Sequence, residues 1–318
     1  MLKYVLKRIA QVIPLLLIVS FIVFSLIQLA PYDAIDSITT PNMSSDTVEL
    51  LRQKYGLDQP FLVQYFMWLK EILQGNFGHS LVSQQSIGQE LLVRIPNTIK
   101  LILPAYVTAM IIAIGLGLLA GANKGKWIDK LIDGICSVGI SMPTFWFAML
   151  LIYLLGYKLD LLPIIGMHTV GKEDSIGDFL QHFIMPYLVL VVAFFPDLTR
   201  YVRSSTLLQL SEDYVMVQQS FGATKKKIFL KHVSKNVLLP IVTQIGLALP
   251  MLVTGAIITE SIFGWPGIGP YLMSATKALD FPVIMAVMLL SATLVILGNL
   301  LSDILYTIVD PRISQGDN

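Results

Sequence analysis

The stretch SEDYVMVQQSFGATKKKIFLKHVSKNVLLP, residues 211–240, is a polar interruption between two long apolar runs. Apolar residues from Tyr214 to Phe221 recur at helical spacing, Gly222 breaks the pattern, and apolar spacing resumes at Ile228. The sequence therefore predicts a helix, a turn and a second helix. A charged hairpin of this length between apolar runs suits a docking surface better than a linker.

The runs on either side of the hairpin are long enough to cross a membrane. Of the 318 residues, 55% are hydrophobic and 14% are charged, whereas soluble domains carry roughly 25% charged residues. Mean hydropathy is +0.71. Because the apolar runs are continuous, helices are favoured over barrel strands, and roughly 20 residues suffice for each span. The sequence predicts an all-α membrane protein, one domain over 1–318, with six transmembrane helices at about 9–32, 98–123, 134–157, 181–202, 236–259 and 281–304.

The Lys and Arg residues are unequally divided between the two sides of these spans. With the N-terminus in the cytoplasm, 14 of the 22 basic residues lie inside and 8 lie outside. An excess of basic residues marks cytoplasmic loops. Both termini and the hairpin, residues 203–235, are therefore expected in the cytoplasm, and the long segment 31–97 is expected outside.

The external segment predicts two short helices. Ser45 or Asp46 can cap one that ends at Gly56, and Pro60 can open another that ends before Gly75. The second helix has an aromatic face. That face suits either a helix lying on the outer leaflet or a lid packed on the outer mouth of a transporter.

Motifs for catalysis and metal binding are incomplete in this sequence. In GANKGKW, residues 121–127, only three residues separate the glycines and Trp127 stands where a phosphate-binding loop needs Ser or Thr. The four histidines lack metal-ligand spacing, the single Cys136 permits no intramolecular disulfide, and no nucleophile elbow is present. We expect no catalytic residue, metal or cofactor in this chain. The net charge of +1 says nothing about nucleic acid, and the basic residues lie where membrane topology would place them, so we expect no nucleic-acid partner.

If this membrane protein moves a substrate uphill, the energy must come from another subunit or from an ion gradient. Ion-coupled carriers keep ionisable groups within their spans, where each costs about 2.5–3.5 kcal/mol on insertion scales. Here Asp197 and Glu260 lie near predicted span ends. An ion-coupled carrier is therefore the less favoured class. These two acids are the expected candidates for a substrate pathway.

The hairpin resembles the cytoplasmic EAA loop of ATP-binding cassette (ABC) import permeases. Four further stretches are similar to the B-type permease subunit of oligopeptide, dipeptide and nickel uptake systems: YGLDQPFLVQYFMWL (55–69), SMPTFWFAMLL (141–151), TRYVRSSTL (199–207) and ESIFGWPGIG (260–269). The similarity runs from about Tyr4 to Arg312. The chain departs from the family pattern at Gln218, where alanine is usual, and Asp213 stands near the customary glutamate position.

The resemblance implies a type I ABC importer permease fold in a bacterial plasma membrane. It implies that the hairpin couples to an ATPase through Asp213, Tyr214, Val215, Gln218, Gly222, Ala223, Thr224, Lys225, Ile228 and His232. The implied partners are a second homologous permease, two nucleotide-binding ATPase subunits that bind ATP and Mg, an extracytoplasmic substrate-binding protein and membrane lipid. Oligopeptides are the expected cargo, with dipeptides or nickel and other metal chelates as alternatives.

Single introduced cysteines test the predicted orientation. Ser211→Cys and Ser314→Cys should be shielded from an impermeant thiol reagent in intact cells, whereas Ser83→Cys should react, because the basic residues place these positions on opposite sides. Labelling of Ser211→Cys from outside would contradict the six-span topology.

Overall fold

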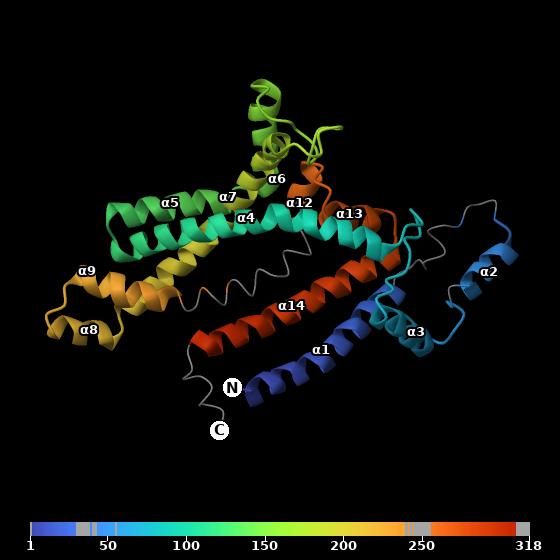
Figure 1. The fold of residues 1–318 in the computed structure, drawn as a ribbon, viewed down its shortest axis with the longest axis horizontal. Coiled ribbons are helices and arrows are strands. Elements are labelled where there is room, and N and C mark those ends of the chain that lie inside the picture. The colour runs from blue at the N-terminus through green and yellow to red at the C-terminus, as the bar shows by residue number, and fades with distance from the viewer. Residues whose placement is uncertain are drawn as a thin grey trace.

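The computed structural model describes residues 2–29, 39, 43–54, 56–238, 241, 244 and 256–309, and their regular elements are helices (Figure 1). The long helices are α1 (Leu2–Gln28), α4 (Ile87–Ala122), α5 (Trp127–Ser141), α7 (Ile176–Leu210) and α14 (Phe281–Val309). The short helices are α2 (Ser45–Lys54), α3 (Phe61–Leu73), α6 (Thr144–Leu151), α8 (Asp213–Ser220), α9 (Lys225–Ile228), α12 (Ile257–Ile262) and α13 (Ile268–Lys277), with π-helical turns at Ile152–Lys158 and Phe229–Val233.

Four helices in the described part of the chain are long and apolar enough to cross a membrane. They are α1, α4, α7 and α14, with apolar windows at 10–28, 87–122, 176–210 and 281–301. The predicted span 236–259 lies largely outside the described residues. The chain is thus an integral membrane protein built from helices.

The predicted span 134–157 differs from a single straight helix. The chain runs through α5, bends by 91° and continues through α6 into the π-helical turn that ends at Lys158. Pro143 causes the bend, because proline cannot donate a helix hydrogen bond and pushes the preceding residue out of the helical region. Met142 accordingly has φ −90 and ψ 114. If the bent pair counts as one span, the described residues contain up to five.

Helices α4 and α7 approach each other closely along their C-terminal halves. A Cβ added at Gly117 would lie 2.9 Å from the carbonyl oxygen of Thr199, and one added at Gly121 would lie 2.5 Å from the side chain of Thr206. Small residues four apart allow two backbones to approach in a membrane, where dispersion contacts drive helix association. A Cβ added at Gly139 of α5 would lie 2.7 Å from the ring of Pro196 of α7, so these two helices are also in close contact. The three glycine contacts bring α4 and α5 onto α7.

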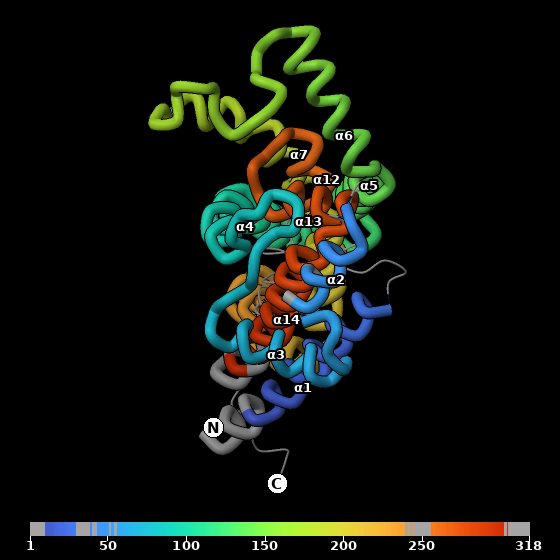
Figure 2. Tube along the Cα trace, turned by 90° about the vertical axis from the view of Figure 1, so that its right-hand side faces the viewer, coloured from blue at the N-terminus to red at the C-terminus, as the bar shows by residue number. Residues whose placement is uncertain are grey.

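Helix α3 packs against α1, which lies beside α14 (Figures 1 and 2). The hydroxyl groups of Tyr65 and Ser20 are hydrogen-bonded at 2.9 Å, and the rings of Phe24 and Trp68 lie 5.5 Å apart. Helices α2 and α3 occupy the positions expected from the sequence, and Gly75 follows α3 with φ +79. These contacts exclude an α3 that rests on lipid alone.

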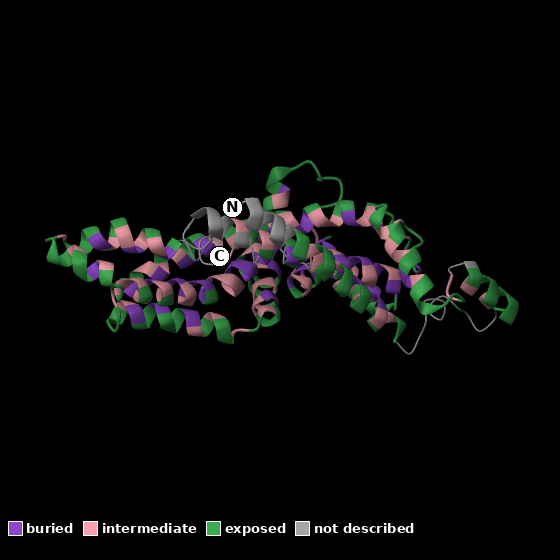
Figure 3. Cartoon of the chain, turned by 90° about the horizontal axis from the view of Figure 1, so that it is seen from below, coloured by how far each residue is buried: buried purple, intermediate pink, exposed green. Residues whose placement is uncertain are grey.

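Large apolar side chains remain exposed along the spans, and Figure 3 shows exposed positions distributed along the long helices. Ile18 and Leu26 on α1, Ile111 on α4 and Val138 on α5 are examples. Apolar surface of this extent is unfavourable in water and favourable against hydrocarbon tails or a second membrane subunit. The exposed faces therefore match the membrane environment predicted from composition.

The α4–α7 contact can be tested by adding one methyl group. We expect Gly117→Ala to lower the melting temperature of the detergent-purified protein, because the new Cβ meets α7 backbone that cannot move away, and overpacking costs about 1–3 kcal/mol. Gly115→Ala is the matched control, since nothing lies within 4 Å of an added Cβ there. Equal melting temperatures for both variants would contradict a close α4–α7 contact.

Candidate functional site

The hairpin after α7 is a helix, a glycine turn and a second helix, as the sequence predicts. Helix α8 ends at Ser220, and Gly222 follows with φ +78, a conformation that costs residues with a Cβ more than glycine. Thr224 then caps α9, because its Oγ1 accepts a hydrogen bond from the backbone N–H of Lys227 at 3.3 Å. The turn is therefore encoded by two adjacent local signals.

One face of the hairpin packs on the membrane helices. Val215, Ile228 and Val233 are buried in one cluster with Met110 of α4 and Val202 of α7. Tyr214 packs at the edge of this cluster. Its partial burial raises the pKa of its phenol above the ordinary value, so the hydroxyl stays protonated and donates to Gln209 Oε1 at 3.0 Å. The hairpin is thus joined through this cluster to α7 and to the middle of α4.

The opposite face of the hairpin is exposed and partly apolar. The phenyl ring of Phe221 is 84% exposed at the turn, and Met216 and Val217 are exposed beside it on α8. Of the residues assigned to coupling, the structure places Tyr214, Val215, Gln218, Ala223, Ile228 and His232 on buried or half-buried positions, and Asp213, Gly222, Thr224 and Lys225 on exposed ones. Sequence reasoning noted Phe221 only as an apolar residue at helical spacing, and it left both Met216 and Phe221 out of the residues assigned to coupling. The sequence did carry a signal for an exposed apolar surface, because α8 is a short helix with apolar residues on more than one side and only one side can pack on the bundle.

Helix α7 connects the hairpin to α5 through two ion pairs. Arg203 donates from Nε and Nη2 to the two carboxylate oxygens of Asp129, at 2.6 and 2.9 Å. Asp129 is buried and also accepts from the backbone N–H of Gly125 at 2.8 Å. One turn away, Arg200 lies 3.3 Å from Asp133. The two-bond pairing of Arg203 with Asp129 fixes the orientation of the side chains as well as their distance. Helices α5 and α7 are therefore linked as one unit beside the hairpin.

Asp197 lies on the same helix but has a different environment. Its side chain is exposed, and it makes no hydrogen bond or ion pair within the described part of the chain. Arg200 and Arg203 form ion pairs with the acids of α5, not with Asp197. A carboxylate without a partner on an apolar helix needs water or another subunit beside it.

Glu260 is enclosed in a packed joint at the opposite end of the bundle from the hairpin. It has no exposed surface, and its Oε2 accepts the backbone N–H of Gly269 at 2.8 Å. A Cβ added at Gly269 would lie 2.7 Å from that oxygen, so the glycine is needed for this close approach. Glu260 was expected to line a substrate pathway, but in this conformation its side chain is enclosed.

The joint fastens the ESIFGWPGIG segment onto α4. Thr98 Oγ1 accepts the N–H of Ile268 at 2.9 Å, and the indole N–H of Trp265 donates to the carbonyl of Asn97 at 2.8 Å. The side-chain amide of Asn97 donates a hydrogen bond from Nδ2 to the carbonyl oxygen of Pro266 at 3.1 Å. Buried polar groups stabilise a structure only when they are paired. This pairing makes the segment a rigid connection between α12, α13 and α4.

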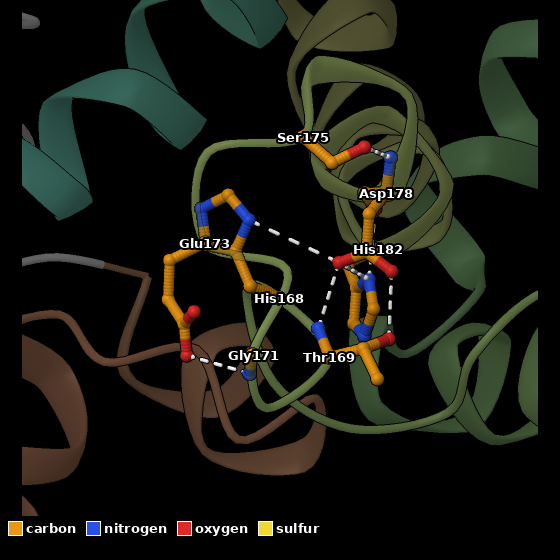
Figure 4. A network of polar contacts seen from close by, with 7 residues as sticks. All are labelled: His168, Thr169, Gly171, Glu173, Ser175, Asp178 and His182. Carbon is orange, nitrogen blue, oxygen red and sulfur yellow. Dashed lines mark hydrogen bonds and ion pairs between the residues drawn. The ribbon is translucent and has the colours of Figure 1, made fainter.

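A second polar network holds the loop before α7 (Figure 4). Ser175 caps the helix by accepting the N–H of Asp178 at 3.3 Å. The Asp178 carboxylate accepts two bonds from Thr169, from N at 2.7 Å and from Oγ1 at 2.6 Å, and His182 Nδ1 lies 2.8 Å from the Asp178 carbonyl oxygen. Sequence reasoning missed this network, although a Ser three residues before an acid is a helix-start signal.

The arrangement defines a class of protein. Apolar helices carry a polar hairpin at one end and two polar joints at the other, and within the described ranges no group of three or more His, Cys, Asp or Glu residues is placed to hold a metal ion. It is a helical membrane protein that carries an exposed polar hairpin outside its bundle.

Comparison with known proteins gives the family. Residues 113–315 match the model of the binding-protein-dependent transport system inner membrane component, and residues 1–102 match the N-terminal model of the same membrane components. The chain belongs to this family of inner membrane components of binding-protein-dependent transport systems. The matches cover both the hairpin and the bundle.

Two relatives illustrate the similarity. The chain is 38% identical over 314 residues to the oligopeptide transport system permease protein AppB of Bacillus subtilis (strain 168), which covers 98% of this chain and 99% of the relative. It is 36% identical over 313 residues to the glutathione transport system permease protein GsiC of Salmonella typhimurium (strain LT2), again with 98% and 99% coverage. The similarity therefore extends over the whole length of each relative.

The Glu260 joint can be tested by removing its acceptor. We expect Glu260→Ala to lower the stability of the purified protein by about 2–4 kcal/mol, because a buried N–H loses its partner and a cavity is left. Glu260→Gln, which keeps one acceptor oxygen, should lower the melting temperature less. Glu49→Ala, at an exposed acid on α2, serves as control. An unchanged melting temperature for Glu260→Ala would contradict a structural role.

Proposed function

We propose that this chain is the membrane-spanning permease subunit of an ATP-driven ABC importer that moves short peptides across the bacterial plasma membrane. The observation that carries the proposal is the exposed apolar tip of the hairpin, Met216, Val217 and Phe221, on a chain whose relatives are named as oligopeptide and glutathione permeases. A tip of this kind is costly in water unless another protein covers it. The chain itself supplies no catalytic step.

The partner at the tip is a nucleotide-binding ATPase subunit, which binds ATP and Mg. The tip places apolar side chains beside exposed Lys225, Lys226 and Lys227. A groove with an apolar floor and an acidic rim is complementary to that surface. One hairpin engages one ATPase, so a second homologous permease with its own ATPase and an extracytoplasmic substrate-binding protein complete the transporter.

The route by which ATPase motion reaches the membrane follows the described contacts. The hairpin packs on α4 and α7 through Val215, Ile228 and Val233. Helix α7 is joined to α5 by Arg203 and Asp129, and to α4 at the glycine contacts. Movement of the hairpin by the closing ATPases would therefore carry three helices together, which changes the side of the membrane to which a central cavity opens.

The full topology belongs to the same proposal. Six spans, with both termini and the hairpin in the cytoplasm, require the segment 236–259 to cross the membrane as the fifth. The unpaired carboxylate of Asp197 then faces the water-filled pathway or the sibling permease, because a charge that faces lipid within a span is unfavourable.

Docking through the hairpin tip can be tested with Phe221→Ala. The variant should reduce co-purification of the ATPase subunits and ATP-dependent peptide uptake by at least about tenfold, since a buried aromatic anchor at an interface is worth about 2 kcal/mol or more. Its melting temperature should not fall, because Phe221 is 84% exposed in the chain alone.

The matched control is Val170→Ala, which removes a side chain that is 96% exposed at the other end of α7. It should leave ATPase association unchanged. Normal association and uptake with Phe221→Ala would contradict the assignment of the tip as the docking site.

A further inference from the structure

A hollow of about 620 Å³ lies beside the beginning of α7, between the loop that precedes this helix and α4. Phe179 and Phe183 of α7 form its aromatic wall, and Lys100 of α4 lines it together with Glu173 and Asp174 of the loop. The volume falls within the roughly 300–1,000 Å³ typical of small-molecule sites. The hollow is far along α7 from the hairpin, at the end that the topology assigns to the outside.

The aromatic wall is built as a rigid stack. The rings of Phe179 and Phe183 are stacked at 5.5 Å, and His168 lies 5.5 Å from Phe179 on the loop side. The fully buried Trp265 supports Phe179 from behind at 5.8 Å. Rings fixed by such contacts present an apolar surface at little cost in conformational entropy when a ligand binds.

Charges of opposite sign line the same hollow. Lys100 is exposed and makes no hydrogen bond or ion pair within the described part of the chain, and the same holds for Asp174. Glu173 Oε1 accepts the backbone N–H of Gly171 at 3.0 Å, and this bond holds the pKa of Glu173 below its ordinary value, so the group is ionised at neutral pH. Lys100 on α4 and the two acids on the loop are therefore available to pair with charged groups of a ligand.

The acidic side of the hollow is held in place by the network around Asp178. Thr169 and Ser175 tie the loop to the beginning of α7, while the side chains of His168 and Glu173 lie on the side of the loop nearest α4 (Figure 4). The loop is thus fixed at both ends of the segment that carries Glu173. Groups held in this way bind without first paying the entropy of ordering the loop.

We propose that this hollow is a receiving subsite for a short zwitterionic peptide, which places its α-carboxylate toward Lys100, its α-ammonium toward Glu173 and Asp174, and a side chain on Phe179 and Phe183. The inference rests on the proposed function as a peptide importer and adds a site on the permease itself. A purely anionic ligand would be repelled by the two acids, and a neutral apolar ligand would gain nothing from the three exposed charges.

Photolabelling of the purified transporter complex tests the subsite without the binding protein. The probe is the tripeptide Ala-Bpa-Ala, where Bpa is benzoylphenylalanine, in three forms: with free termini, N-acetylated and C-amidated. The labelled segment is identified by mass spectrometry. Because hydrogen bonds to charged groups are worth about 1.5–3 kcal/mol and less where exposed, loss of one pairing should lower labelling about fivefold to tenfold.

The variants distinguish binding of the peptide's α-carboxylate from binding of its α-ammonium group. Lys100→Gln should lower labelling at α7 for the free and N-acetylated peptides and leave the amidated form at its already low level. Glu173→Gln should lower it for the free and amidated peptides and leave the acetylated form unchanged. Lys100→Arg should restore labelling. Lys172→Gln, on the same loop but not among the residues that line the hollow, should behave as wild type.

Labelling outside the hollow, no labelling, or equal loss with all three peptides would overturn the subsite. Uptake of the free tripeptide into proteoliposomes that contain the complete transporter separates this result from a failure of the proposed function. A wild-type complex that imports the peptide but is not labelled in the hollow overturns the subsite alone. A complex that imports no peptide overturns the proposed function.

Discussion

The close approach of α4 and α7 at Gly117 and Gly121 is the contact on which the rest of the described bundle depends. Without it, the buried cluster that joins the hairpin to α4 and α7 would separate, because Met110 and Val202 lie on the two helices that the glycines bring together. The Arg203–Asp129 pair then adds α5 to the same unit. A membrane interior offers no hydrophobic gain for helix association, so small residues that permit dispersion contacts determine which helices move together.

Local signals in the sequence were sufficient for the hairpin. Helical spacing, a glycine that adopts positive φ and a threonine cap lie within one short segment, and each acts on its immediate neighbours. The short external helices were predicted for the same reason. The bend after α5 also had a local signal in Pro143, but a hydropathy window sums side-chain character and is insensitive to backbone direction. One span was therefore predicted where the chain turns by 91°.

The environment of the charged residues could not be predicted in the same way. Glu260 is surrounded by groups that include Thr98, and that pairing requires a contact between segments far apart in the sequence. The pairing of Arg200 and Arg203 with the acids of α5 likewise follows from helix packing, not from spacing along α7. The hollow beside α7 combines a lysine from one helix with acids from a distant loop. Sequence spacing describes single elements well, whereas such sites depend on how elements are brought together.

The length of α7 has a consequence for where the hairpin stands. With 35 residues and a rise of about 1.5 Å per residue, the helix is about 52 Å long, whereas the hydrocarbon core is about 30 Å thick. A tilt of up to about 40° shortens the crossing too little to contain such a helix within the hydrocarbon. Part of α7 must therefore extend beyond the hydrocarbon core into the headgroup region, since core and headgroups together are about 40–45 Å thick. The hairpin follows the end of α7, so an extension at that end places the turn at Gly222 outside the hydrocarbon, where a bulky soluble partner can approach it.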